Sequence, residues 1–456
     1  VGAIKSNLGH TEAAAGVAGL IKVVQALRYA QVPANLHFRA ANPKLPLEGA
    51  ALEFPTRLRA WPEAMPRMAA VSSFGLGGTN AHAIVAAAPE AAVAEATEAG
   101  GAVLVPLSAN FPAAGRARAE KWGGRLAGAG ASIAALAATA ALRRSHHSQR
   151  LALVARDRAE AAGKLAAWLR GETVPGVVVG ARTPGASGRV VFVFSGQGSQ
   201  WIGMGRTLVA QDPAFRAAFE ACEAAIERFA GWSLRAEIHA AAEPNATMPV
   251  DVIQPAIFAM QVSLAAALRA RGIEPDAVVG HSMGEVAAAH VAGAIGLEDA
   301  VRVICTRSRL ARERASGRGG MAVVELPVAV AEARVAERPG LSVAVHNSPR
   351  SVVLSGDAAA LDEVLAELES EGVWLRRVQV DYASHSPQMD PLMPVLREAL
   401  AGIGPRAGSV QFFSTVTGRV EDGARLDANY WAENLRARVR FAEAIQALAQ
   451  DGAELF

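Results

Sequence analysis

The chain has 456 residues, enough for two to four domains, and 51% of them are hydrophobic. Its 45 basic and 43 acidic residues nearly cancel and no cluster of Lys or Arg stands out, so nucleic acid and anionic membranes are poor candidate partners. No uninterrupted apolar run approaches the ~18 residues of a membrane span, and no signal peptide is visible. The two cysteines, interpreted as reduced thiols, fit a cytoplasmic protein.

Residues 1–88 are rich in Gly and Ala and begin without a Met, which we interpret as the interior of a longer protein. Near the end of this segment the sequence predicts two strands, over residues 69–74 and 81–87, joined by a Gly-rich turn at residues 75–78. Residues 88–101 are rich in Ala, Glu and Pro and have little amphipathic period, so they are typical of a linker.

A small α/β unit is predicted next. Apolar patterns favour strands over residues 103–107 and 151–155 and a helix over residues 133–144. A second break at residues 180–188, which contains Gly, Pro and Ser, ends this unit. The predicted domains are therefore residues 1–88, 89–188 and 189–456.

The third domain opens with an apolar run at residues 189–194 that is typical of a buried strand. Within this domain, residues 321–380 alternate between short strand-like and helix-like apolar patterns, which predicts a β-α-β-β-α-β order. This is the split βαβ, ferredoxin-like pattern, and we interpret it as a small subdomain inserted in a parallel α/β core. The predicted elements of the insertion are, in chain order, residues 321–326, 328–336, 341–345, 351–354, 358–372 and 373–380.

A candidate nucleophile, Ser282, lies between two glycines in the sequence GHSMG at residues 280–284. An apolar run at residues 277–279 precedes it, and an Ala-rich helical pattern at residues 286–295 follows it. Ser between two Gly at this spacing is the nucleophile-elbow pattern, a sharp strand-to-helix turn for which the glycines leave room. The first N–H groups of the helix then point at the reaction centre. The pattern predicts a serine that forms an ester.

Such a serine needs a base, and the ten histidines are the candidates. His385 is favoured because it follows the last predicted strand of the insertion, on a loop that returns to the core, where active-site residues concentrate. A capping or surface histidine is the alternative interpretation. His281 neighbours the serine, but adjacent residues at an elbow point away from each other. His290 lies within the helical pattern, where histidines are more often packed.

Two groups are candidates for an oxyanion hole. One is the backbone N–H of Met283, the residue after the nucleophile. The other is the side-chain amide of Gln197, in the sequence GQGSQ at residues 196–200, which follows a predicted strand and would lie along the crevice where α/β folds bind ligands. Because this loop lacks the spacing of a dinucleotide or P-loop motif, a phosphate cradle is disfavoured.

Arg307 is the candidate for choosing the acyl group. It lies in an apolar helical pattern, where an arginine is often a surface residue whose charged end reaches solvent. If it faces the pocket instead, its rigid fork matches a carboxylate bidentately. It would then select an acyl group that carries a free acid, such as a malonate.

No metal site is predicted. The two cysteines, Cys222 and Cys305, lie in apolar helical patterns with no His or Cys at metal-ligand spacing, so we expect reduced core thiols. His146 and His147 form a pair before a predicted strand, which favours a solvated structural pair over metal ligands.

Together these residues resemble the malonyl-CoA:acyl carrier protein transacylase family, in the acyltransferase-domain form of modular type I polyketide synthases. The resemblance covers about residues 189–456 and rests on residues 196–200, 280–285, Arg307 and 382–385, in family order and spacing. It implies a parallel-sheet, hydrolase-like core with an inserted ferredoxin-like subdomain. It also implies a Ser–His pair rather than a full triad: Ser282 is acylated, and His385 acts as base and then as acid. Arg307 would grip the malonyl carboxylate, while Gln197 and the Met283 N–H would hold the oxyanion.

The first domain resembles the last portion of a β-ketoacyl synthase, a thiolase-like fold, through residues 5–12 and 73–82. In that family the residues that match Lys5 and His10 support decarboxylative condensation. The family's nucleophilic cysteine and its other histidine lie upstream, so residues 1–88 are not expected to condense alone. Residues 89–188 resemble the linker that joins the synthase and acyltransferase domains.

The resemblance also predicts how the third domain ends. The family closes it with a final strand and a Pro-His-Pro-like segment, and this chain stops at Phe456 before them, so the domain is expected to be truncated. Backbone groups near that end are expected to orient the catalytic histidine. Full activity of this stretch therefore depends on how His385 is held.

The substrate prediction rests on the sequence Tyr-Ala-Ser-His, residues 382–385. In the family this sequence accompanies methylmalonyl selection, whereas His-Ala-Phe-His accompanies malonyl. Tyr382 and Ser384 are thus the candidate selectivity residues, because Ser384 in place of Phe leaves volume for the α-methyl group. One methyl group is worth only ~1–3 kcal/mol, so the selection is expected to be leaky.

The predicted reaction is a ping-pong transfer without a bound cofactor. The acyl group passes from methylmalonyl-CoA or malonyl-CoA to Ser282 and then to the phosphopantetheine thiol of an acyl carrier protein domain. The adjoining ketosynthase domain is the other expected partner, in a synthase expected to be homodimeric. The alternatives are malonyl-specific loading, a serine hydrolase, which needs an acid between Ser and His, and a non-catalytic docking fragment.

Overall fold

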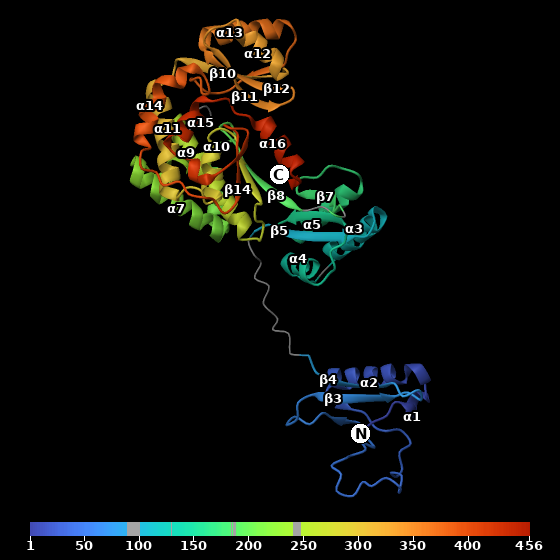
Figure 1. Cartoon of the computed structure of the whole chain (residues 1–456). Helices are drawn as coiled ribbons and strands as arrows, with labels where there is room; N and C mark the ends of the chain where they lie inside the picture. Colours follow the sequence, from blue (N-terminus) through green and yellow to red (C-terminus); the bar gives the residue numbers. More distant parts are fainter. Residues whose placement is uncertain (89–100, 129, 184, 186–187, 240–247) are drawn as a thin grey trace. The chain divides into compact units, whose positions relative to one another are not determined.

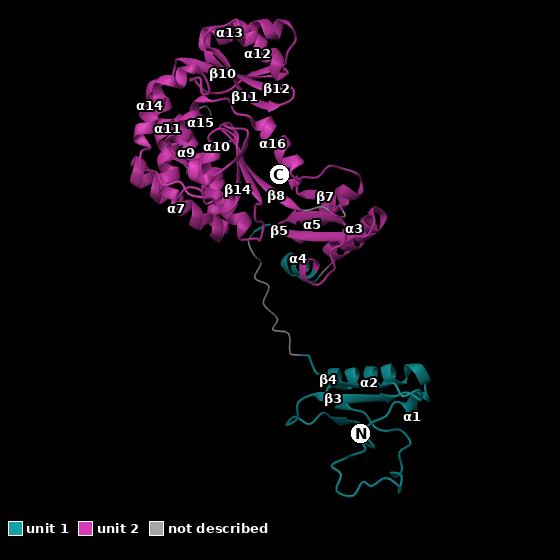
Figure 2. Cartoon of the chain, in the orientation of Figure 1, with its two compact units in different colours: residues 1–102, 129–139 teal, residues 103–128, 140–456 magenta. Residues whose placement is uncertain are grey.

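The structure is a computed structural model that describes residues 1–88, 101–128, 130–183, 185, 188–239 and 248–456. The chain divides into two compact units, Val1–Ala102 with Ala129–Thr139, and Val103–Gly128 with Ala140–Phe456 (Figure 2). Most of the predicted linker at residues 88–101 lies outside the described residues.

In the first unit a long helix packs on a hairpin. Helix α2 (Ala15–Tyr29) contacts strand β3 (Met68–Phe74), which pairs antiparallel with β4 (Asn80–Ala86). A Cβ added to Gly16 would lie 3.0 Å from Ser73 Cβ, so this glycine permits the close approach of helix and strand. The predicted strand–turn–strand is confirmed. The other elements are α1 (Lys5–Leu8), η1 (Glu12–Ala14), β1 (Gln31–Val32) and β2 (Arg59–Ala60).

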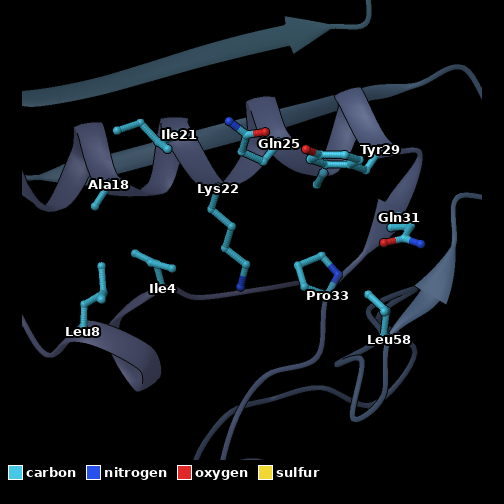
Figure 3. A pocket seen from close by; sticks show the side chains of 11 residues that line it. Ile4, Leu8, Ala18, Ile21, Lys22, Gln25, Tyr29, Gln31, Pro33 and Leu58 are labelled. Carbon is cyan, nitrogen blue, oxygen red and sulfur yellow. The ribbon is translucent and has the colours of Figure 1, made fainter.

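Much of the apolar surface of residues 1–88 is exposed. Leu27 is buried, but Ile21 and Tyr29 on the same helix are 56% and 64% exposed. Ile4 and Leu58 lie opposite them across a pocket of about 360 Å³ (Figure 3). Contiguous apolar surface of this kind is typical of a face that another segment covers.

The predicted α/β unit forms in residues 103–181. Its strands build an antiparallel sheet in the order β5–β6–β7, on which helices α3 and α5 pack. The predicted helix and strands are confirmed, with slightly different bounds. The elements are β5 (Val103–Ala109), α3 (Pro112–Ala127), α4 (Ile133–Leu142), β6 (Gln149–Ala155), α5 (Arg158–Leu169) and β7 (Val177–Ala181).

The described residues after 188 include a mostly parallel sheet in the order β15–β14–β9–β8–β16. Its strands β8 and β14 are labelled in Figure 1. All neighbouring pairs run parallel except β14–β15, so the antiparallel strand stands at one edge. The α/β core with a parallel sheet is confirmed. The strands are β8 (Arg189–Phe194), β9 (Ala277–Gly280), β14 (Gln411–Ser414), β15 (Arg419–Glu421) and β16 (Ala453–Leu455).

Helices cover both faces of this sheet because its side chains alternate between two apolar cores. Phe192 and Val278 belong to the large core with α7, α9, α10 and α11, whereas their neighbours Val191 and Val279 pack with α16. The helices are α6 (Arg206–Gln211), α7 (Pro213–Ala230), α8 (Leu234–His239), α9 (Val250–Arg269), α10 (Gly284–Val291), α11 (Leu297–Arg314), η2 (Pro387–Leu392), α14 (Met393–Ala399), η3 (Gly423–Arg425), α15 (Ala428–Arg436) and α16 (Phe441–Gln450).

Helix α9 is, among the described helices, the one long and apolar enough to cross a membrane. Within the protein, 78% of that apolar stretch is buried. The buried core helix of a globular domain meets the same criteria. Its packing against α7, α10 and α11 accounts for its apolar composition.

The insertion has the predicted β-α-β-β-α-β order. Its antiparallel sheet has the strand order β11–β12–β10–β13, and α12 and α13 pack on it (Figure 1). The ferredoxin-like prediction is confirmed, although the last strand, predicted over residues 373–380, covers only residues 375–377. The elements are β10 (Gly319–Val324), α12 (Val328–Ala336), β11 (Leu341–Ser348), β12 (Ser351–Asp357), α13 (Ala358–Ser370) and β13 (Leu375–Arg377).

Candidate active site

Ser282 stands at the turn between β9 and α10. Its φ is +54°, a left-handed value that is unusual for a residue other than glycine. A Cβ on Gly280 would lie 2.1 Å from the Glu285 nitrogen, and one on Gly284 would lie 2.2 Å from the Phe194 carbonyl oxygen. Side chains larger than hydrogen therefore do not fit at either glycine. The predicted strand–turn–helix at this position is confirmed, with the helix beginning at residue 284 rather than 286.

His385 contacts the candidate nucleophile. Its Nε2 lies 2.7 Å from the Ser282 Oγ, although the two residues are 103 positions apart in sequence. The histidine is only 3% exposed, so the alternative of a surface or capping histidine is wrong. Its φ of +60° is also left-handed, so the Ser and the His both occupy strained backbone positions.

The carbonyl oxygen of Ala437 orients His385. It lies 2.7 Å from Nδ1, and because a carbonyl only accepts, Nδ1 must carry the proton. Nε2 then holds the lone pair that faces the Ser282 hydroxyl. We expected backbone groups near the end of the domain to orient this histidine. The group that does so is instead the carbonyl of Ala437, which directly follows α15. The chain reaches the histidine there because the His385 N–H also bonds the Leu435 carbonyl.

His385 is built to be neutral. Burial, and then the positive charge of Arg307, lower its pKa from 6.5 to about 3. The backbone carbonyl at Nδ1 works in the opposite direction but does not offset them. An unprotonated imidazole at neutral pH is the form that can accept a proton from serine.

This pKa predicts an unusual pH profile for acylation of Ser282. His385 is active only while neutral, and a lowered pKa keeps it neutral as the pH falls. We therefore expect the second-order acylation rate to stay flat down to about pH 5, without the usual half-loss near ~6.5. Stopped-time intact-mass measurements across the pH range check this.

An acid limb with its midpoint at or above ~6.5 would contradict the assigned neutral state. The folded state must be monitored by circular dichroism at each pH. Below the pKa of the unfolded histidine, the unfolded chain binds a proton that the folded chain does not, so acid lowers the free energy of unfolding.

Arg307 is buried rather than on the surface. It is 3% exposed on α11, and its Nη1 donates to the Asn434 Oδ1 at 2.5 Å. Within the described part of the chain no carboxylate forms an ion pair with it, and its Nε has no hydrogen-bond partner. Burial lowers its pKa from 12.5 to about 10, which still leaves the guanidinium charged at neutral pH. A buried cation without a paired anion is suited to binding an anionic ligand.

Tyr382 joins the two predicted loops. Its hydroxyl donates to the Gln197 Oε1 at 3.2 Å and accepts from the Gln254 Nε2 at 3.1 Å. Because the Gln197 Oε1 accepts this hydrogen bond, the Nε2 of Gln197 is the group that can donate to a ligand. The loop also touches the elbow, because a Cβ on Gly196 would lie 2.9 Å from the His281 Nδ1.

Met283 occupies the N-cap position of α10, and the residue is 2% exposed. The first N–H groups of a helix have no partner within it, so they are available to an oxyanion. Gln197 and Met283 thus come from two segments that both adjoin the Ser282 turn.

Ser384 is held in place from the inserted subdomain. Its carbonyl oxygen accepts from the Ser355 Oγ on β12 at 2.6 Å, and the residue is 6% exposed. The neighbouring Ser386 Oγ donates to the Ala383 carbonyl at 2.8 Å. These bonds fix the loop that carries Tyr382 and His385.

A buried carboxyl group beneath the elbow was missed by sequence reasoning. Glu285 is 0% exposed; its Oε1 accepts from the backbone and the hydroxyl of Thr415, and its Oε2 accepts from Tyr430 and Asn434. Burial raises its pKa, which these hydrogen bonds oppose. Glu285 follows the elbow motif directly, but nothing in the sequence indicated that it faces inward.

The remaining candidates have other contacts or belong to the other unit. His281 Nε2 lies 3.0 Å from the Asn347 Oδ1, so this ring points to the subdomain rather than to Ser282, as predicted. Burial lowers its pKa. Lys5 and His10 are exposed and belong to the other unit.

Metal-ligating side chains do not cluster in the part of the chain that the structure describes. No group of three or more His, Cys, Asp or Glu residues comes together among the residues described. Cys222 and Cys305 are free and buried, and burial raises each thiol pKa to about 12, so the prediction of reduced core thiols is confirmed.

Three sequence families match this chain. Residues 191–456 match the family described as acyl transferase domain, over more than half of the chain. Residues 1–39 match the β-ketoacyl synthase C-terminal domain, and residues 41–154 match the ketoacyl-synthetase C-terminal extension.

Polyketide synthases are among the curated proteins similar to this chain. The spectinabilin polyketide synthase system protein NorA' of Streptomyces orinoci is 46% identical, and the match covers 100% of this chain and 13% of that protein. Erythronolide synthase EryA3 of Saccharopolyspora erythraea is 44% identical, over 100% of this chain and 14% of that protein. The chain therefore spans about an eighth of the length of these relatives.

Solved acyltransferase domains share the fold. The domain from module 8 of the salinomycin polyketide synthase superimposes with a TM-score of 0.72 at 39% identity, over 77% of this chain and 83% of that one. The acyltransferase domain of SpnD, in complex with 2-(pent-4-yn-1-yl)malonyl, gives 0.69 at 30% identity over the same shares.

Proposed function

This chain belongs to the acyl transferase domain family of modular polyketide synthases, and on that premise we propose that it loads a methylmalonyl extender unit. The acyl group passes from CoA to Ser282 and then to the phosphopantetheine thiol of an acyl carrier protein. The carrier protein and the adjoining ketosynthase domain are the proposed partners, in a homodimeric synthase of the cytoplasm. No bound cofactor takes part.

The first half-reaction forms an ester on Ser282. Nε2 of His385 takes the hydroxyl proton while Oγ attacks the thioester carbonyl, whose negative oxygen is held by the Met283 N–H and the Gln197 amide. Collapse of this intermediate breaks the carbon–sulfur bond. His385 returns its proton to the departing CoA sulfur, which restores the neutral imidazole.

The second half-reaction reverses the roles. The phosphopantetheine thiol gives its proton to Nε2 of His385 as its sulfur attacks the ester carbonyl. The carbon–oxygen bond to Ser282 breaks, and the proton passes from His385 to the serine oxygen. The free carboxylate of the extender unit stays paired with the Arg307 guanidinium throughout.

The observation that carries the proposal is that the same site holds a neutral base, His385, and a buried cation, Arg307, that forms no ion pair within the described chain. Nε2 of His385 faces the Ser282 Oγ at 2.7 Å, and Arg307 has no carboxylate partner in the described chain. A serine hydrolase needs a carboxylate at Nδ1, whereas a backbone carbonyl occupies that position here. The methylmalonyl assignment rests on the small side chain of Ser384.

A competition experiment tests both the acylation of Ser282 and the choice of methylmalonyl over malonyl. With methylmalonyl-CoA and malonyl-CoA at equal concentration, we expect the methylmalonyl adduct on Ser282 to predominate in intact-mass spectra. Ser384→Phe should shift the adduct ratio toward malonyl by about 5- to 150-fold, because one methyl group in a pocket is worth ~1–3 kcal/mol. Ser370→Phe, at an exposed serine on α13, is the matched control.

The outcomes separate the alternatives. Equal or faster malonyl loading would refute the extender assignment but keep the acyltransferase. Absence of an adduct with either thioester would favour the docking fragment. The adduct should be discharged by a phosphopantetheinylated carrier protein, and steady release of free acid without carrier would favour a hydrolase.

A further inference from the structure

Asn434 connects the candidate carboxylate clamp to the nucleophile. It lies on α15, is 2% exposed, and its Oδ1 accepts from the Arg307 Nη1 at 2.5 Å. Its Nδ2 donates to the Glu285 Oε2 at 2.8 Å and to the Ser282 carbonyl oxygen at 3.2 Å. A single amide therefore reaches α11, α10 and the elbow at once.

The orientation of this amide follows from its neighbours. A guanidinium only donates, so it must face Oδ1, and the Ser282 carbonyl only accepts, so it must face Nδ2. The amide therefore stands between the Arg307 cation and the Glu285 carboxyl group. The attraction of Glu285 acts on Arg307 across this spacer, not through a direct ion pair.

We infer that Asn434 is a positioning residue that orients Arg307 through a neutral acceptor and so keeps its charge for the carboxylate of the acyl substrate. This inference rests on the proposed function, in which Arg307 binds that carboxylate. A carboxylate at position 434 would pair with the guanidinium and neutralise it before substrate arrives. An amide fixes the same hydrogen bond without adding a charge.

The role predicts a change in selectivity rather than a loss of activity alone. Methylmalonyl-CoA and propionyl-CoA differ by the carboxylate that Arg307 is proposed to bind. In Asn434→Asp, the preference for methylmalonyl over propionyl should fall by about 10- to 100-fold, and this ratio, not either rate alone, is the readout. General damage to the fold would lower both rates by the same factor and leave their ratio unchanged.

The test measures initial rates of Ser282 acylation by intact mass, with methylmalonyl-CoA and propionyl-CoA in separate reactions. Asn429→Asp is the matched control, because Asn429 is exposed on the same helix, and its ratio should equal that of the unchanged chain. Asn434→Ala provides a second variant that adds no charge. Its ratio should fall several-fold, less than for Asn434→Asp, because the charge of Arg307 remains but its orientation is lost.

An unchanged ratio in Asn434→Asp would overturn the inference, whatever the absolute rates. If that variant does not fold, an unchanged ratio in Asn434→Ala overturns it equally. If the unsubstituted chain shows no preference for methylmalonyl over propionyl, the proposed role of Arg307 is refuted, and the inference with it. The two failures are therefore distinguishable.

Discussion

Replacing Ser282 by Ala should abolish the acyl adduct and lower transfer to the carrier protein by about 10³-fold or more. The substitution removes only the Oγ that lies 2.7 Å from the His385 Nε2, so no other nucleophile is left in line with the base. Incubation with methylmalonyl-CoA followed by intact-mass spectrometry checks the adduct. Transfer is followed by the mass of the carrier protein.

Structural damage does not explain such a loss. Ala and Ser meet the same backbone strain at a φ of +54°, so the elbow should keep its geometry. Ser370→Ala, at an exposed serine of α13, is the control and should acylate like the unchanged chain. A methylmalonyl adduct that persists in Ser282→Ala would place the nucleophile elsewhere.

Replacing Arg307 by Met should remove the preference for acyl groups that carry a carboxylate. Losing a buried, hydrogen-bonded charge partner costs ~2–5 kcal/mol, so the ratio of methylmalonyl to propionyl acylation should fall by about 30- to 5,000-fold. Met keeps much of the side-chain volume without the charge. The measurement is the ratio of the two acylation rates from intact-mass time courses.

The unfolding temperature of Arg307→Met shows whether Arg307 is present for substrate binding or for stability. Arg307 is buried without a carboxylate partner in the described chain, so its charge costs desolvation free energy that no ion pair offsets. Arg307→Met should therefore unfold at the same temperature as the unchanged chain or higher. Arg309→Met, at an exposed position of the same helix, is the control for both measurements. A retained preference for methylmalonyl would exclude the clamp.

The sequence was informative wherever function depends on a local pattern. The elbow at Ser282 is such a case, because Gly spacing, a preceding apolar run and a following helix all lie within twenty residues. The ferredoxin-like insertion was equally readable, since each of its strands and helices has its own apolar period. Its short last strand was overestimated because only three of its residues find partners on β10.

The supports of the site could not be read in the same way. The group that orients His385 is a backbone carbonyl, and every residue type has one, so Ala437 carries no signal. Asn434 is one polar residue on an amphipathic helix and resembles a solvent-facing position until α15 is packed against α14 and η2. Glu285 looks like a favourable acidic residue in the first turn of α10, although it is buried.

One short segment, residues 434–441, ties together several of these supports. It holds Asn434 and Ala437, and Val439 bonds the backbone of Ala344 and His346 in the inserted subdomain. Phe441 packs on the ring of His281 with their centroids 5.3 Å apart. For protein engineering, residues 434–441 should therefore be kept together. A chimaera that takes the Ser282 turn and the His385 loop from one synthase should take residues 434–441 from the same synthase. Its downstream junction should follow residue 441.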